Sequence, residues 1–232
     1  MTRENEVEQF EHNGYIIRIL YDIEPGSPRE WDNVGTMVCW HNRYNLGDEQ
    51  PKLNPLEWKR ELVLGQWKEA WFPNDLREAM ERGIDSNRYV DDISDEQIDE
   101  VLEKHFIILP LYLFDHSGII MSTSSSRFSA VDSAGWDWGQ VGFIYCSMEK
   151  ARSEFSGTDA EITEKAIQCL TGEVETYSQY LEGDVYGYII EDQNKKHIDS
   201  CWGFYGMEDV VDQAKACCPD APVVNEEYVA NV

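Results

Sequence analysis

The segment FIILPLYLFDHSGIIMS, residues 106–122, decides the fold class of this 232-residue chain. It opens with an apolar run, residues 106–114, whose branched and aromatic side chains are typical of a buried strand. The turn residues Asp115–Gly118 then lead into a second short strand over residues 119–122. Because two strands joined by a short turn pair side by side, the segment predicts a pair of antiparallel strands.

The same pattern of paired strands continues on both sides of this segment. Strands are predicted over residues 14–22, 34–41 and 141–146, and a hairpin joins 185–191 to 197–204. Helices separate the pairs without a regular strand–helix–strand order. The predicted fold class is therefore α+β, with a mixed or mainly antiparallel sheet packed with several amphipathic, acidic helices. We expect a single domain over residues 1–232, with 50–104 as a candidate helical insertion.

Capping residues mark the helix starts. At three places a capping side chain stands three residues before an acidic or amide side chain: Asn54 with Glu57, Ser94 with Gln97, and Thr158 with Glu161. The first of these helices is expected to end near Gly65. Further helices are predicted over residues 74–82, 148–155 and 207–217. Residues 122–135 are rich in small side chains and predict a loop.

The charge of the chain limits its partners. Forty-five acidic residues face 19 basic ones, a formal net charge of −26. Such a charge repels phosphate backbones and anionic lipid surfaces, so we expect no direct binding to nucleic acid or membrane. The N-terminal residues show no signal peptide, and six cysteines show no disulfide or metal spacing. A cytoplasmic protein without cofactor or metal is the expectation.

The acidic residues are concentrated in two predicted helical regions. The second region, residues 153–193, holds ten acids and a single basic residue, Lys165. The candidate partner-binding acids of the two regions are Asp75, Glu78, Glu81, Asp85, Asp91, Asp92, Asp95, Glu96, Asp99, Glu100, Glu103, Asp159, Glu161, Glu164, Glu173 and Glu175. Carboxylates one helical turn apart, about 5.4 Å, imitate a phosphate backbone, whose charges lie about 3.4 Å apart along each strand. The alternatives are a solvated face that improves solubility and adaptation to a salty cytoplasm.

A short pattern repeats along the chain, with an Asp before the Val and Gly that open a strand. Its copies contain Gly35, Gly142 and Gly187, and the first two follow the pairs Trp31-Asp32 and Trp136-Asp137. A glycine in a strand commonly lets another backbone or a large ring approach closely. The alternative interpretation is functional and places both Trp-Asp pairs on a shared rim.

Catalytic candidates are His41, Asp115, His116 and Asp137. The consecutive residues Asp115, His116 and Ser117 point in different directions and form no triad among themselves. There is no nucleophile elbow, phosphate-binding loop or dinucleotide fingerprint in the sequence. The sequence favours a protein that is not an enzyme.

Four longer motifs resemble a family of uncharacterised acidic proteins of phages, plasmids and conjugative elements. The motifs are DNVGTMVCWHNRYNLGD (residues 32–48), LPLYLFDHSGI (109–119), WDWGQVGFIY (136–145) and DSCWGFYG (199–206). The resemblance implies no catalytic residue. It implies a mobile-element context, in which small acidic proteins block restriction enzymes, CRISPR effectors and other DNA-binding defences of the host.

Two functions of different classes follow. The first is a DNA-mimic-like inhibitor, non-enzymatic, that docks its acidic helices on the basic nucleic-acid-binding surface of a host defence protein, as in anti-restriction or anti-CRISPR action. The second is a small-ligand or nucleotide-processing enzyme, whose pocket would be formed by Trp31, Asp32, His41, Asp115, His116, Trp136 and Asp137. A structural or regulatory component of the element is a third possibility that the sequence does not separate from the first. The oligomeric state is left open.

Overall fold

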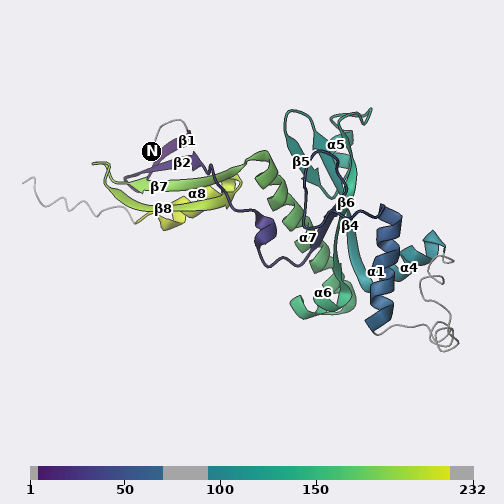
Figure 1. Cartoon of the computed structure of the whole chain (residues 1–232). Coiled ribbons are helices and arrows are strands. Elements are labelled where there is room, and N and C mark those ends of the chain that lie inside the picture. The colour runs from purple at the N-terminus through teal and green to yellow at the C-terminus, as the bar shows by residue number, and fades with distance from the viewer. Residues whose placement is uncertain (1–4, 70–93, 220–232) are drawn as a thin grey trace, which may run out of the picture. The chain divides into compact units, whose positions relative to one another are not determined.

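The computed structural model of the chain describes residues 5–69 and 94–219 and has the predicted α+β fold (Figure 1). Its strands form two four-stranded sheets in which neighbouring strands are antiparallel. The chain divides into two compact units, unit 1 with Met1–Glu30 and Thr176–Val232, and unit 2 with Trp31–Glu175. The single domain predicted over residues 1–232 would comprise both units, and it stays a prediction.

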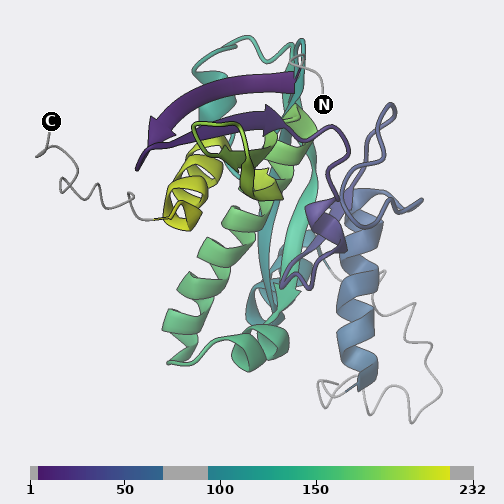
Figure 2. The same cartoon turned by 90° about the vertical axis from the view of Figure 1, so that its left-hand side faces the viewer.

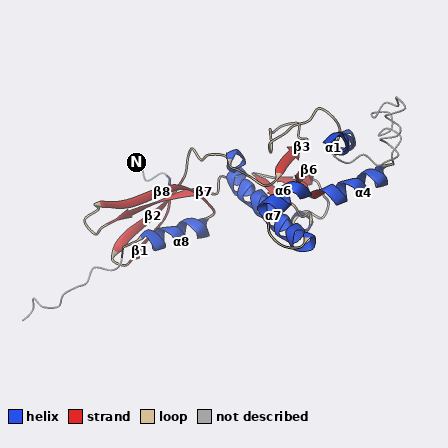
Figure 3. Ribbon diagram, turned by 90° about the horizontal axis from the view of Figure 1, so that it is seen from below, coloured by secondary structure: helices blue, strands red, loops and turns tan. Residues whose placement is uncertain are grey.

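In its described residues, unit 1 contains a sheet with strand order β1-β2-β7-β8 and helix α8 on one face of it. Its elements are β1 (Glu6–His12), β2 (Tyr15–Tyr21), the 3-10 helix η2 (Pro28–Glu30), β7 (Val185–Glu191), β8 (His197–Tyr205) and α8 (Met207–Cys217). Helix α8 lies along the strands (Figure 3) and buries Val210 and Ala214 against Ile17, Ile19 and Ile190. Branched side chains at alternate strand positions thus form the core of this unit.

Strand β1 was not predicted from the sequence. Its segment, EVEQFEH, has exposed or half-exposed side chains throughout, and only Phe10 packs against the core. A strand at the edge of a sheet needs one apolar contact rather than an apolar run, so periodicity gives little signal for it.

Unit 2 contains the second sheet, with strand order β3-β6-β4-β5. Its elements are β3 (Thr36–Cys39), α1 (Pro55–Glu69), α4 (Asp95–His105), β4 (Phe106–Asp115), β5 (Ile119–Ser122), α5 (Ser126–Ser129), β6 (Trp138–Ser147), α6 (Met148–Glu154) and the first part of α7 (Asp159–Glu182). The predicted pair 106–122 is the hairpin β4–β5, in which Leu113 lies opposite Met121. The Ser-rich segment, predicted as a loop, contains the short helix α5.

Helices cover both faces of this sheet. Successive side chains of β6 point to opposite faces, and apolar side chains on each face pack against a helix. On one face Phe143 stacks on Trp58 of α1, with ring centroids 5.7 Å apart. On the other face, Ile144 of β6 and Leu170 of α7 lie against Gly35. Figure 2 shows α7 in green and α1 in blue on either side of the teal strands.

The repeated glycines have the structural role that the sequence analysis favoured. A side chain at Gly142 would meet the backbone carbonyl of Val38 on the paired strand β3, and one at Gly187 would meet the ring of Trp202. Close approach of a backbone and of a large ring therefore explains these two glycines.

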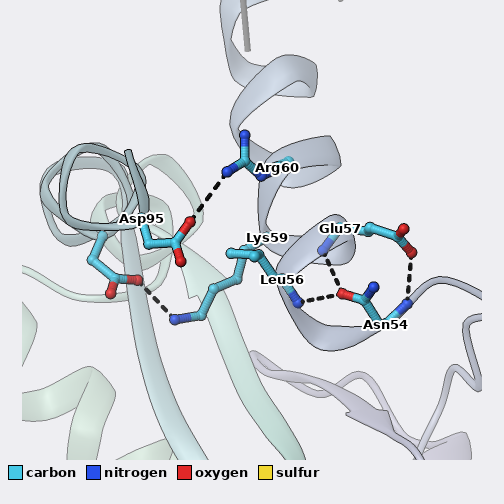
Figure 4. A network of polar contacts seen from close by, with 7 residues as sticks. Asn54, Leu56, Glu57, Lys59, Arg60 and Asp95 are labelled. Carbon is cyan, nitrogen blue, oxygen red and sulfur yellow. Dashed lines mark hydrogen bonds and ion pairs between the residues drawn. The ribbon is translucent and has the colours of Figure 1, made fainter. Parts of the chain in front are cut away.

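The capping predictions for α1 and α7 are confirmed. The Asn54 carboxamide accepts hydrogen bonds from the backbone N–H groups of Leu56 and Glu57, while the Glu57 carboxylate accepts the Asn54 N–H (Figure 4). Thr158 and Glu161 bond in the same reciprocal way. Helix α1 continues to Glu69, beyond its expected end near Gly65. The helix predicted over residues 74–82 lies outside the described residues.

Candidate functional site

The first predicted acidic region is represented in the structure by α4. Asp95, Glu96, Asp99, Glu100 and Glu103 all lie on this helix, and all five side chains are exposed. The remaining candidates of this region, Asp75, Glu78, Glu81, Asp85, Asp91 and Asp92, lie outside the described residues.

The apolar side of α4 fixes the direction in which its acids point. Ile98 and Leu102 are buried in a cluster with Val63 of α1 and Phe106 of β4. Helical geometry places the five acids together on the adjoining side of the helix. The short sequence DEQIDEVLE therefore gives α4 one apolar and one acidic side.

Two of these acids form ion pairs with α1. The Asp95 carboxylate lies 3.1 Å from Nη2 of Arg60 (Figure 4). The Asp99 carboxylate lies 2.7 Å from Nζ of Lys59. These ion pairs connect α4 to α1 at the edge of the acidic side that is nearest to α1. These ion pairs were not predictable from local sequence, because the partners are separated by 35 and 40 residues.

Glu96, Glu100 and Glu103 follow one another on successive turns at the outer edge, and we call them the acidic stripe. The pKa of Glu96 lies below its ordinary value, because the Glu96 backbone N–H and the Ser94 side chain hydrogen-bond to its carboxylate. Residues spaced by three or four positions are surface neighbours on a helix. The stripe is thus a line of neighbouring carboxylates, with the Glu96 carboxylate held in its charged form.

A pocket of about 280 Å³ adjoins the stripe. Its apolar floor consists of Phe106, Ile108, Pro110 and Phe143. Lys59, Asp99, Leu102 and Glu103 complete the lining. Carboxylates and apolar side chains therefore meet in a pocket lined by residues of α1, α4, β4 and β6.

The second predicted acidic region does not form one continuous face. Asp159 pairs with Arg152 at 2.9 Å, which lowers the Asp159 pKa, and Glu161 is used in capping α7. Glu173 accepts hydrogen bonds from the backbone N–H groups of Val34 and Gly35 in its own unit, at 2.7 and 3.1 Å. Glu164 and Glu175 are exposed. The acids of α7 thus have separate structural surroundings.

The catalytic candidates meet in part. Nδ1 of His116 lies 3.0 Å from the Asp137 carboxylate, and the Asp115 backbone N–H bonds to the Asp137 carbonyl at 2.8 Å. The Asp115 carboxylate pairs with Arg43 at 2.9 Å. His41 accepts the backbone N–H of Arg43 through Nδ1. These groups are oriented by one another at the turn after β4.

The seven-residue pocket expected for an enzyme does not form. Asp137 directly precedes β6, whereas the carbonyl of Asn33, next to Asp32, accepts a hydrogen bond from Lys150, beyond the other end of β6. Trp31 and Asp32 are therefore at the end of the sheet opposite Asp137. The interpretation that places the two Trp-Asp pairs on a shared rim is wrong for the same reason. Trp136 itself is 88% exposed.

Asp132 is a structural residue that the sequence analysis missed. Its carboxylate accepts backbone N–H groups of the four residues 134–137, which lowers the pKa of Asp132. This arrangement fixes the segment that presents Asp137. An Asp three residues before Gly135 is a turn signal that could have indicated it.

Within residues 5–69 and 94–219, no three His, Cys, Asp or Glu side chains gather closely enough to hold a metal ion. Across the same residues, every helix is too short or too polar to cross a membrane.

The fold and site define an acidic α+β chain with a line of carboxylates beside a small apolar pocket. Comparison with known protein families, curated proteins and solved structures finds no match. The resemblance to mobile-element proteins therefore stays a hypothesis.

Proposed function

We propose that this chain is a non-enzymatic, DNA-mimic-like inhibitor that docks on the basic nucleic-acid-binding surface of a host defence protein. The observation that carries the proposal is the arrangement of α4, with three exposed carboxylates on successive turns and two more beside them. The net charge of −26 adds long-range attraction to a basic partner. The action would take place in the cytoplasm of the host cell of a phage or other mobile element.

The proposal concerns α4 more than α7. The acids of α4 are aligned on a helix whose other side is anchored by Ile98 and Leu102. A line of charges on a rigid element offers a basic groove a fixed pattern, and electrostatic complementarity of this kind mainly raises the association rate and selects the partner. Asp159, Glu161 and Glu173 of α7 are bound by three separate groups along the helix, whereas the ion pairs of Asp95 and Asp99 lie at one edge of the acidic side of α4.

Displacement of DNA from purified host restriction enzymes and CRISPR effectors tests the proposal. Each protein is loaded with a fluorescent duplex, and the chain is added while anisotropy is recorded. We expect the duplex to be displaced from at least one of them. Because salt screens exposed charges, direct binding of the chain to that protein, measured without DNA, should weaken at least about tenfold between about 50 and 300 mM salt.

Two matched variants separate a specific face from bulk charge. Glu96→Gln, Glu100→Gln and Glu103→Gln together neutralise the stripe, while Glu8→Gln, Glu11→Gln and Asp212→Asn remove three exposed acids of unit 1. We expect the first variant to compete at least about tenfold less well and the second to change by less than about twofold. If no duplex is displaced, or both variants lose equally, the proposal is refuted.

A further inference from the structure

The pocket beside the acidic stripe already holds one cation of the chain. Nζ of Lys59 lies 2.7 Å from the Asp99 carboxylate and 5.6 Å from the centroid of the Phe143 ring. A cation over an aromatic ring is attracted by the negative face of the ring, and a neighbouring carboxylate adds to this attraction. The rim of this pocket therefore presents a carboxylate and an aromatic ring to a cation.

Beyond the Lys59–Asp99 pair, whose charges cancel, the lining offers one further carboxylate next to apolar side chains. Glu103 is exposed one turn beyond Asp99, and Phe106, Ile108 and Pro110 form an apolar floor next to it. A volume of about 280 Å³ is at the lower end of ligand pockets, so the space suits a single long side chain.

Arginine has the chemistry that matches this lining best. Its guanidinium group is planar, more weakly hydrated than an ammonium group, and able to stack on apolar or aromatic surfaces while it bonds a carboxylate with two N–H groups. Lysine would expose a compact, strongly hydrated charge to the same floor. Arginine is also among the residues that dominate binding energy at protein interfaces.

We infer that the pocket between α1, α4 and β4 receives an arginine side chain of a basic partner, with Glu103 as its carboxylate. The inference rests on the proposed function and names the contact on which docking depends. The stripe steers the partner to the surface, and the pocket holds it there.

Binding of a single arginine to the full chain tests the pocket directly. The probe is Nα-acetyl-arginine amide, compared with Nα-acetyl-citrulline amide, a neutral molecule of nearly the same shape. Methyl resonances of Leu102 and Ile108, which line the pocket, report binding. We expect saturable shifts with the arginine probe, with a dissociation constant on the order of 1–10 mM, and at least about fivefold weaker binding of the citrulline probe.

The variants Glu103→Gln and Glu100→Gln form a matched pair, because both residues are exposed acids of α4 and only Glu103 lines the pocket. We expect Glu103→Gln to weaken the arginine probe about fivefold, about 1 kcal/mol, and Glu100→Gln to change it less than about twofold. Equal effects of the two variants, equal binding of both probes, or unmoved methyl resonances would each overturn the inference.

The outcomes separate this inference from the proposed function. If the chain displaces duplex DNA from a host protein but the arginine probe leaves Leu102 and Ile108 unchanged, the pocket assignment fails and the docking proposal stands. If the probe binds in the pocket but no duplex is displaced, the docking proposal fails and the pocket remains a guanidinium site.

Discussion

Replacing Glu173 of α7 should release the segment that leads into β3. The Glu173 carboxylate accepts the backbone N–H of Val34 at 2.7 Å and that of Gly35 at 3.1 Å. Glu175, two residues further along the same helix, is exposed. Both acids belong to the same predicted docking region, so Glu173→Ala and Glu175→Ala compare an acid that accepts these backbone N–H groups with one that is exposed.

The expected magnitude follows from the two donors. Leaving a buried donor without an acceptor costs about 1–3 kcal/mol, and hydrogen bonds to charged groups are at the stronger end. Because both bonds are only partly buried, we take the lower value for each, about 2 kcal/mol in total. We expect Glu175→Ala, a surface change, to stay within about 0.5 kcal/mol.

Amide hydrogen exchange measures this free energy where it acts. Exchange reports local opening, so about 2 kcal/mol should speed exchange at Val34 and Gly35 by about thirtyfold in Glu173→Ala. Glu173→Gln keeps a neutral acceptor and should lie between the wild type and Glu173→Ala. The reasoning is refuted if Glu173→Ala and Glu175→Ala change the exchange of these two amides equally.

Three further outcomes are expected. Gly142→Ala should destabilise unit 2 by about 3 kcal/mol in urea unfolding, because its Cβ meets the paired strand, whereas Gly139→Ala on the same strand has open space and should cost far less. Burial raises the pKa of Cys146 from 9.0 to about 11. At about pH 8 a thiol reagent should therefore label Cys146 at least about a hundredfold more slowly than exposed Cys201. Equal labelling rates, measured by peptide mass spectrometry, would contradict this prediction. Hydrogen bonds from the capping threonine Thr158 lower the pKa of Glu161. The contribution of Glu161 to folding stability is therefore present above the ordinary glutamate pKa and is lost as the pH falls through the lowered pKa. Glu161→Gln should flatten this part of the pH profile of thermal unfolding, and an unchanged profile would count against the prediction.

The secondary structure was largely predictable because most elements carry local signals. The apolar run of β4 and the turn after it predicted the β4–β5 hairpin, and the capping residues of α1 and α7 predicted where these helices begin. Edge strand β1 was missed, since only Phe10 of its side chains packs against the core. Local signals end where pairing between distant segments decides the outcome.

The candidate site was predictable only in part. The sequence places five acids within residues 95–103, and the apolar positions Ile98 and Leu102 fix the side of α4 that they occupy. It does not show that Lys59 pairs with Asp99 or that an apolar floor lies beside them. These features depend on how α1, α4 and β4 pack.

By itself, then, the sequence determined the α+β class, the large negative charge and the helices that carry much of it. These properties follow from composition and from local periodicity. Only the tertiary structure decided the role of each acid. Glu173 and Glu175 are equivalent in the sequence, yet one binds a backbone 139 residues away and the other faces solvent. Packing brings distant groups to one carboxylate and leaves another free for water, and periodicity carries no information about which is which.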